Sequence, residues 1–274
     1  MATATKTKTS KNGKAAAAKK VALPTKDRFA KTRLDIPPMH TALYKATLIG
    51  DDDLIINAMG PKAKRKLLQS MGPKNTASKV RPPKDPAAEY FDAMYVLNNV
   101  YDFKAGSYSN PHTQDQAYTG NIEEDYGTIM RPIRGKDCTA IHGVACAGVR
   151  QGMVRAAGSC GATMTHTKCN IRVLSSHGNY LPIKFETLVA GEDPVTVGNK
   201  QTDLRYRPYY SGWSVDIVIA HQSEIVGPEE LTQLLRNAGQ FVGLGEWRNE
   251  RGGQFGMYTV DLNSIQYELL KDNA

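Results

Sequence analysis

One short segment combines the residue types that bind phosphates and nucleobases. Gly243–Gly256 contains five glycines, two arginines and two aromatic residues. Glycine lets a backbone approach an anion closely, arginine binds phosphate through paired hydrogen bonds, and an aromatic ring gives a base a stacking surface. A flexible connection made of turn residues is the alternative interpretation. The predicted nucleic-acid contacts are Gly243, Gly245, Trp247, Arg248, Arg251, Gly252 and Gly253.

A second segment, Arg205–Trp213, alternates basic and aromatic residues. This pattern suits single-stranded nucleic acid, because rings stack on bases while guanidinium groups bind phosphates. The alternative is that Tyr206, Tyr209 and Trp213 cover the edge of a hydrophobic core. The predicted contacts in this segment are Arg205, Arg207, Tyr209 and Tyr210.

Basic residues between 131 and 155 extend the candidate groove. A helix predicted over 139–157 has small residues on most sides, which is typical of a helix that another segment approaches closely. Arg150 projects opposite the main apolar arc of this helix, whereas Arg155 falls inside the arc, so Arg150 is the better candidate. The residues assigned to this part of the groove are Arg131, Arg134, Lys136 and Arg150.

The net charge of +8 is concentrated near the N-terminal end. Residues 1–34 contain eight lysines and two arginines against one acid, residues 61–84 contain eight basic residues and no acid, and residues 85–274 are acidic in balance. We expect 1–34 to be a disordered basic arm that attracts phosphates non-specifically, with a solubilising tail as the alternative. In the second basic segment, electrostatic attraction is assigned to Lys62, Lys64, Arg65 and Lys66.

Other patterns exclude classes of protein. No apolar run approaches the roughly 20 residues of a membrane helix, and no secretory signal begins the chain. The six histidines lack metal-ligand spacing, and the four cysteines form no CxxC pair. Asp51–Asp53 could hold a divalent cation, but three acids beside a glycine are more typical of a solvated turn. We therefore assign no catalytic residue, metal or cofactor.

The order of elements predicts an α+β fold. Without the insertions, the chain reads strand, helix, strand, strand, helix, strand, which predicts a ferredoxin-like (RRM-like) four-stranded antiparallel sheet with two helices. An insertion at about 57–138 and a projecting hairpin at about 180–200 are added to it. The polar stretch 102–136 is expected to be a long loop, and the turn of the hairpin is expected at 190–193. The elements are expected at 41–56 (strand, turn and short strand), 86–101 (helix), 139–157 (helix), 169–175 (strand), 213–221 (strand), 228–242 (helix) and 257–262 (strand). Apolar residues alternate along the strands at 41–56 and 213–221, and they form one core-facing stripe along the helix at 228–242.

A glycine-rich stretch between the second helix and the last strand of such a unit resembles the RAMP superfamily of CRISPR-associated proteins. The nearest likeness is the backbone subunit that polymerises along guide RNA. The "VGLGEWR…GGQFG" stretch is also similar to small bacteriophage proteins of unknown role. The resemblance covers 41–56 and 139–262, and it implies that the hairpin corresponds to the thumb and the insertion to the variable lateral domain of those subunits.

These patterns predict a non-enzymatic protein that binds single-stranded nucleic acid, with RNA favoured over DNA, and assembles side by side along the strand. The expected organisation is a basic arm at 1–34 and a RAMP-like domain at 35–274, located in the bacterial cytoplasm or, if phage-encoded, in the host cytoplasm. A homo-oligomer or filament, with other effector-complex subunits, would be the partners. The alternatives are a phage protein that anneals single-stranded DNA, a structural or inhibitory interaction subunit, and a metal-dependent nuclease that depends on Asp52. The resemblance also implies His142, His166 or Asp51–Asp53 as candidates for RNA cleavage.

Overall fold

Alternating burial along two strands explains the centre of the main sheet. In β1 (Thr41–Gly50), Ala42, Tyr44, Ala46 and Leu48 are buried, and the residues between them are half-buried or exposed. In β12 (Ser214–Gln222), the buried positions alternate in the same way from Val215 onwards. Because successive side chains of a strand point to opposite faces, each strand presents one apolar face to the core. Both alternations confirm the sequence prediction.

The computed structural model describes part of the chain, and the described residues all belong to one structural unit, Met39–Ala274. The predicted basic arm at 1–34 and the electrostatic residues Lys62, Lys64, Arg65 and Lys66 lie outside them, so both stay predictions. The described residues are 40–58, 85–99, 101–102, 107–108, 119, 121–197 and 201–270.

The larger sheet has seven strands in the order β13-β1-β12-β9-β7-β3, with β8 also pairing with β12. All its pairs are antiparallel. β8 covers the second half of β12, and β9 pairs with its first two residues. The strands that join β1 and β12 in this sheet are β3 (Tyr95–Val96), β7 (His142–Ala145), β8 (Ile171–Leu174), β9 (Tyr180–Lys184) and β13 (Tyr258–Leu269).

A second sheet has the order β2-β11-β10-β6. Its centre is a long hairpin in which β10 (Thr187–Val197) and β11 (Gln201–Ser211) pair along their full length. β2 (Leu54–Ile55) and β6 (Ile133–Arg134) each add only two residues at the base of the hairpin. A separate pair joins β4 (Tyr101–Asp102) to β5 (Ser107–Tyr108).

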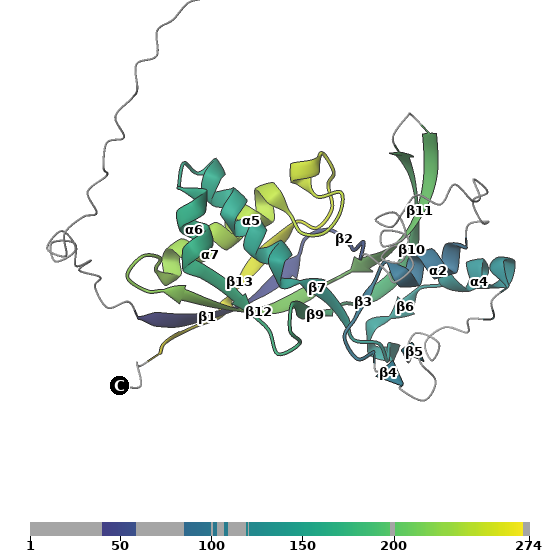
Figure 1. The fold of residues 1–274 in the computed structure, drawn as a ribbon, viewed down its shortest axis with the longest axis horizontal. Helices are drawn as coiled ribbons and strands as arrows, with labels where there is room; N and C mark the ends of the chain where they lie inside the picture. The colour runs from purple at the N-terminus through teal and green to yellow at the C-terminus, as the bar shows by residue number, and fades with distance from the viewer. Residues whose placement is uncertain are drawn as a thin grey trace, which may run out of the picture. The chain divides into compact units, whose positions relative to one another are not determined.

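Helices cover one face of the larger sheet (Figure 1). α5 (Cys146–Ser159) contacts α6 (Met164–Asn170), α7 (Pro228–Asn237) and the π-helical turn η3 (Ala238–Val242) that continues α7. α2 (Pro86–Asp92) packs on β11 and on α4 (Ile122–Ile129). Two short 3-10 turns complete the described elements, η2 (Gly135–Asp137) and η4 (Asn249–Arg251).

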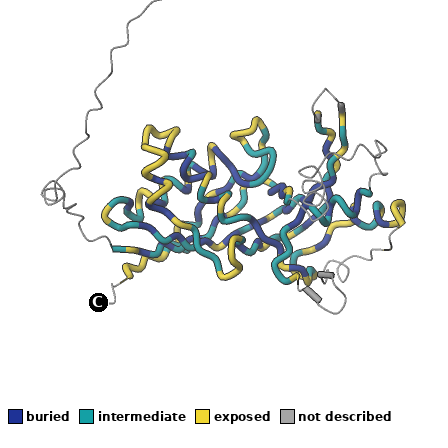
Figure 2. The backbone as a smooth tube through the Cα atoms, viewed as in Figure 1, coloured by how far each residue is buried: buried dark blue, intermediate teal, exposed yellow. Residues whose placement is uncertain are grey.

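The buried residues form one core that runs through both sheets and the helices above them (Figure 2). Trp213 lies in it at 1% exposure and donates its Nε1 hydrogen to the carbonyl oxygen of Asp52 at 2.7 Å. The architecture is therefore mixed α+β with antiparallel sheets. None of the helices in the described ranges is long and apolar enough to cross a bilayer.

Two predicted helices are shorter than the sequence pattern suggested. α2 begins at Pro86 as predicted, with the Asp85 side chain accepting a hydrogen bond from the amide of Ala88 at 3.1 Å, but it ends at Asp92 and the chain continues into β3. The helix predicted over 139–157 begins only at Cys146. The residues before it form β7, whose main chain pairs with β9. Short apolar runs fit either a strand or a helix, and here pairing with a neighbouring strand decides.

Three other boundaries also differ. The predicted strand at 169–175 begins at Ile171, because α6 occupies the residues before it. The predicted hairpin turn at 190–193 is part of β10, so the hairpin connects β10 to β11 through residues 198–200 instead. The polar stretch 102–136, expected to be a long loop, contains α4, whose N-cap Asn121 accepts a hydrogen bond from the amide of Glu123 at 3.2 Å.

Candidate nucleic-acid interface

The glycine-rich segment Gly243–Gly256, here called the loop, is fixed to β2 and to the turn before it by main-chain hydrogen bonds. The amide of Glu246 donates to the carbonyl of Ile55 at 2.9 Å, and the amide of Gly256 donates to the carbonyl of Asp53 at 2.9 Å. The amide of Leu244 also donates to the carbonyl of Gly256 at 2.8 Å, which closes the base of the loop. The loop therefore has a defined position beside the second sheet.

Glycine is required where the loop backbone turns against other backbone. Gly245 has a φ of 80°, and a Cβ atom there would lie 2.3 Å from the carbonyl oxygen of Ile55. Gly256 has a φ of 70°, and its Cβ would lie 1.8 Å from the carbonyl oxygen of Leu244. Side chains are disfavoured at such φ values and these contacts leave them no room. The glycines therefore shape the loop.

The loop amides do not converge on an anion as the sequence analysis expected. Gly243 donates its amide hydrogen to Ala238, Gly252 donates to Asn249, and Gly253 donates to Arg248. These donors are used inside the protein, since buried amides pair wherever they can. These three glycine amides are therefore not available to an anion at the loop.

A pocket of about 320 Å³ separates the loop from the first turns of α5. Arg155 of α5 and Arg248 of the loop both line it, and both bind the same carboxylate oxygen, Oε2 of Glu250. Arg248 contributes Nη2 at 3.0 Å and Nε at 3.1 Å, and its Nη1 donates to the carbonyl of Gly245 at 2.8 Å. The pocket therefore has two guanidinium groups at its rim, bridged by one internal carboxylate.

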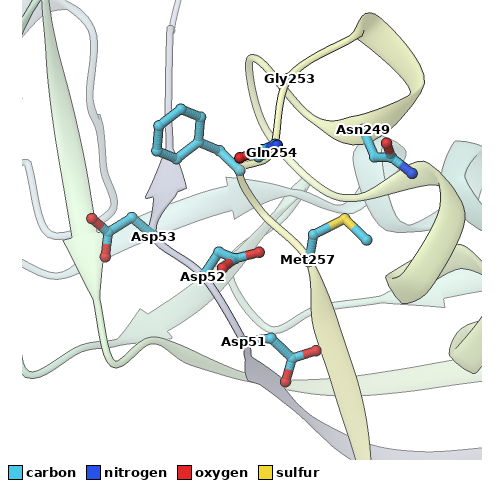
Figure 3. A pocket seen from close by; sticks show the side chains of 8 residues that line it. Asp51, Asp52, Asp53, Asn249, Gly253, Gln254 and Met257 are labelled. Atoms are coloured by element: carbon cyan, nitrogen blue, oxygen red, sulfur yellow. The ribbon is translucent and has the colours of Figure 1, made fainter.

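The opposite side of the loop is acidic. A pocket of about 900 Å³ is lined by Asp51, Asp52 and Asp53, by Met257 after the loop, and by the loop residues Asn249, Gly253, Gln254 and Phe255 (Figure 3). The three carboxylates point in different directions, and within the described residues there is no group of three histidine, cysteine, aspartate or glutamate side chains that could hold a metal ion. A phosphate would be repelled from this side, so the arginine side of the loop is the candidate interface.

The loop also meets the hairpin. The guanidinium carbon of Arg207 on β11 lies 4.6 Å from the centre of the Trp247 ring, and Arg207 Nη2 lies 2.9 Å from Oδ2 of Asp193 on β10. Arg207 and Asp193 are only 4% and 5% exposed. The contact is an ion pair whose atoms are not aligned for a hydrogen bond, and a cation over an aromatic face adds attraction.

Tyr209 extends this contact. Its hydroxyl donates to Oδ1 of Asp193 at 2.5 Å, and its ring packs edge-on against Phe255 of the loop at 5.6 Å between centroids. Burial, and next the hydrogen bond to Asp193, raise the pKa of the Tyr209 hydroxyl well above its usual value. The two segments that the sequence analysis selected separately are thus joined in one cluster of rings and charges.

On the helix-free face of the larger sheet, the two central strands β1 and β12 carry none of the rings that RNA-recognition sheets use for stacking. The two central strands present Lys45, Thr47 and Asp216 there, with aliphatic residues and serine around them. Asp216 binds Lys184 at 2.7 Å and accepts a hydrogen bond from Thr47 at 2.8 Å, which lowers the pKa of Asp216. This face is charge-paired and is not the candidate interface.

Comparisons with known proteins find only distant structural similarity. No protein-family model matches the chain, and no curated protein matches it. A solved structure, the "Cryo-EM structure of the Type III-B Cmr-beta bound to cognate target RNA", contains a chain that is similar to this one with a TM-score of 0.40 and 6% sequence identity. The similarity covers 84% of this chain and 61% of that chain, so this chain spans about three fifths of its length.

Arg150 is not in the candidate interface, although the sequence analysis preferred it. Arg155 lies there instead. Arg150 donates Nε to the carbonyl of Ile171 at 3.1 Å and Nη2 to the carbonyl of Lys168, so it caps the C-terminal end of α6. Arg155 lies on the α5 face that η3 and the loop approach, which it shares with Gly148 and Gly152. The sequence contains a signal for this position. Gly148 and Gly152 are four residues apart and Arg155 follows three residues later, a spacing that places all three on one face of a helix.

The predicted hairpin residues divide by strand face. Tyr210 is fully buried and hydrogen-bonded to Nδ1 of His142 at 2.9 Å, so no base can stack on it. Arg207 is buried against Trp247 and contributes to the cluster from inside. Arg205 is partly exposed and pairs with Asp203 at 3.3 Å and with Glu89 at 4.0 Å. Tyr206 and Trp213 are buried, as the core interpretation of this segment predicted.

The basic group Arg131, Arg134 and Lys136 is exposed but lies on and beside β6. β6 and β2 are the two opposite edge strands of the second sheet, and the loop docks on β2. The structure therefore does not bring this group to the loop. Among the histidines considered for cleavage, His142 is fully buried and His166 is exposed on α6.

Proposed function

We propose that this protein binds single-stranded RNA without acting on it chemically, through the loop and the side of the hairpin that contacts it. The observation that carries the proposal is the packing of Arg207 on Trp247, which joins two basic, aromatic segments 40 residues apart in the sequence into one surface. Exposed Arg251, half-buried Trp247 and half-buried Tyr209 lie along this surface, a combination that suits a chain of phosphates and bases.

The topology supports a ferredoxin-like unit of the RAMP type. β13, β1, β12 and β8 lie side by side in that order, all antiparallel, and α5 and α7 cover one face. The loop joins the second helix of this unit to its last strand, as in the resemblance stated above. Copies are proposed to assemble side by side along the RNA, with the hairpin as the projecting element between neighbours.

Binding of labelled oligouridine, followed by fluorescence anisotropy at low and high salt, tests the proposal. Arg251→Gln should weaken binding about five- to tenfold, because one charge-assisted phosphate contact is lost. Arg236→Gln, the same change on exposed α7, should weaken it less than twofold. Equal effects of the two substitutions would contradict the loop as the interface.

The same assay separates the alternatives. Tighter binding of oligothymidine, with rings or filaments formed on DNA, would favour an annealing protein. Absence of binding to either oligonucleotide, with a particle of fixed size in light scattering, would favour an interaction subunit. Cleavage of the oligonucleotide that EDTA abolishes would indicate a nuclease.

A further inference from the structure

We infer that Glu250 occupies an anion subsite formed by Arg155 and Arg248, and that one backbone phosphate of the bound strand replaces its carboxylate. This inference rests on the proposed function, and it assigns a specific phosphate position within that surface. In this arrangement Glu250 competes with the phosphate and so limits the affinity of the site for RNA.

The geometry of the bridge is that of a bound anion. Both guanidinium groups converge on one oxygen of Glu250, although they come from α5 and from the loop. Arginine forks are suited to carboxylate and phosphate alike, so a phosphate oxygen can take the position of Oε2. Glu250 lies on the exposed turn η4, with its side chain 31% exposed, and can move away without disturbing the core.

The surroundings of the bridge fit a nucleotide unit. The 320 Å³ pocket behind the two arginines is lined by Gly148 and Gly152 of α5, by Gly245 of the loop and by the side chain of Tyr95. The pocket has room for part of a nucleotide, and the ring of Tyr95, which packs against that of Tyr180 with centroids 4.6 Å apart, offers a base an aromatic neighbour. In the resting protein the two arginines and the two pocket-side acids, Glu246 and Glu250, balance in charge.

If Glu250 and phosphate compete for the same site, the effect of removing the carboxylate on RNA affinity has a predictable direction. Removing the carboxylate should strengthen RNA binding, whereas removing a carboxylate elsewhere should change only the net charge. Glu250→Gln is therefore compared with Glu229→Gln, which makes the same charge change on exposed Glu229 in the first turn of α7. Glu250→Gln should bind oligouridine about tenfold more tightly than the wild type, and Glu229→Gln less than twofold more tightly.

Two further variants allow the inference to be tested even if Glu250→Gln does not fold. Glu250→Asp shortens the side chain and weakens the bridge while keeping the charge, so it should bind with intermediate affinity if Glu250→Gln does not fold. The double variant E250Q/R155Q removes the subsite together with the carboxylate and should lose the gain. Inorganic phosphate should raise the melting temperature of Glu250→Gln more than that of the wild type or of the double variant.

The outcomes distinguish this inference from the proposed function. If the wild type binds RNA and Glu250→Gln binds no better than Glu229→Gln, the subsite is wrong and the proposed function stands. If no variant binds RNA but phosphate selectively stabilises Glu250→Gln, the anion subsite stands and the proposed function is wrong. If neither RNA nor phosphate distinguishes Glu250→Gln from Glu229→Gln, the subsite is overturned.

Discussion

Asp193 and Arg207 are the charged pair on which the contact between hairpin and loop depends. Their side chains are nearly inaccessible to water, and each compensates the charge of the other. Removing one partner of a buried pair leaves an uncompensated charge, and this is the costly outcome. The hydroxyl of Tyr209 uses the remaining oxygen of Asp193.

Asp193→Ala should lower the free energy of unfolding by about 3–5 kcal/mol, because Arg207 would stay buried without its counter-charge. Adding Arg207→Met to it should restore part of this loss, because the remaining charge is replaced by an apolar side chain. Urea unfolding of the two variants measures both effects. A loss of less than about 1 kcal/mol for Asp193→Ala would mean that the pair is solvated.

A second residue-scale prediction concerns acid stability. The hydrogen bond from His40 lowers the pKa of Glu224 to about 2, from an ordinary value of 4.5. Because the pKa in the folded state is depressed, the stabilisation is complete above about pH 4.5 and is lost as the pH falls towards 2. Glu224→Gln should remove the part of the pH dependence of the melting temperature that falls in this window, and an unchanged profile would contradict the bond.

The alternation along β11 could be predicted only in part from the sequence. A strand places Tyr206, Pro208 and Tyr210 on one face and Arg205, Arg207 and Tyr209 on the other, and the structure buries all of the first set. The core interpretation of this segment grouped Tyr206 with Tyr209, but the period of two places them on opposite faces, and only Tyr206 is buried. Nothing in the local sequence shows that Arg207 is buried, because its partners Asp193 and Trp247 are distant in the chain.

At the scale of elements, the conformation of the loop depends on positions that only glycine can occupy. Gly252 has a φ of 80° with no atom within 4 Å of the place of a Cβ, whereas the Cβ of Gly256 would collide with the carbonyl of Leu244. Both positions are in left-handed backbone, but only one is also crowded. Substituting each glycine in turn therefore distinguishes the cost of left-handed backbone from the cost of a steric clash.

Gly252→Ala should cost about 1–2 kcal/mol in free energy of unfolding, which is the strain of a left-handed side chain alone. Gly256→Ala should cost about 3–5 kcal/mol, because the backbone around Leu244 must also shift. RNA affinity should change little in the first variant and fall in the second. Equal losses of stability in thermal unfolding would mean that the loop adapts freely and is not held by β2.

The elements show why some patterns were sufficient and others were not. The buried alternation of β1 and β12 and the apolar stripe of α7 were strong, periodic signals, and these elements lie where the sequence predicted. Gly191 was interpreted as part of a turn, yet it pairs with Arg207 within β10, and the ring of Tyr209 lies 2.0 Å from the place of its Cβ. A glycine that makes room for a ring on the neighbouring strand looks like a turn residue in the sequence.

At the scale of the whole molecule, charge is divided between the described domain and the basic segments near the N-terminal end. Residues 1–34 and 61–84 contain more than half of the basic residues, and they lie outside the described residues. Within the described part, many arginines are already paired with acids, as at Glu250, Asp193 and Asp203. Non-specific attraction would then come from the basic segments, and placement of the strand from the loop and hairpin.

The most direct test of this account is ultraviolet cross-linking of the full chain to oligouridine, followed by mass spectrometry of the attached peptides. We predict cross-links in Gly243–Gly256, centred on Trp247, and in the neighbouring strand at Tyr209. These cross-links should persist when residues 1–34 are removed and should decrease in Arg251→Gln. Cross-links confined to residues 1–84, or to the charge-paired face around Lys45 and Asp216, would contradict it.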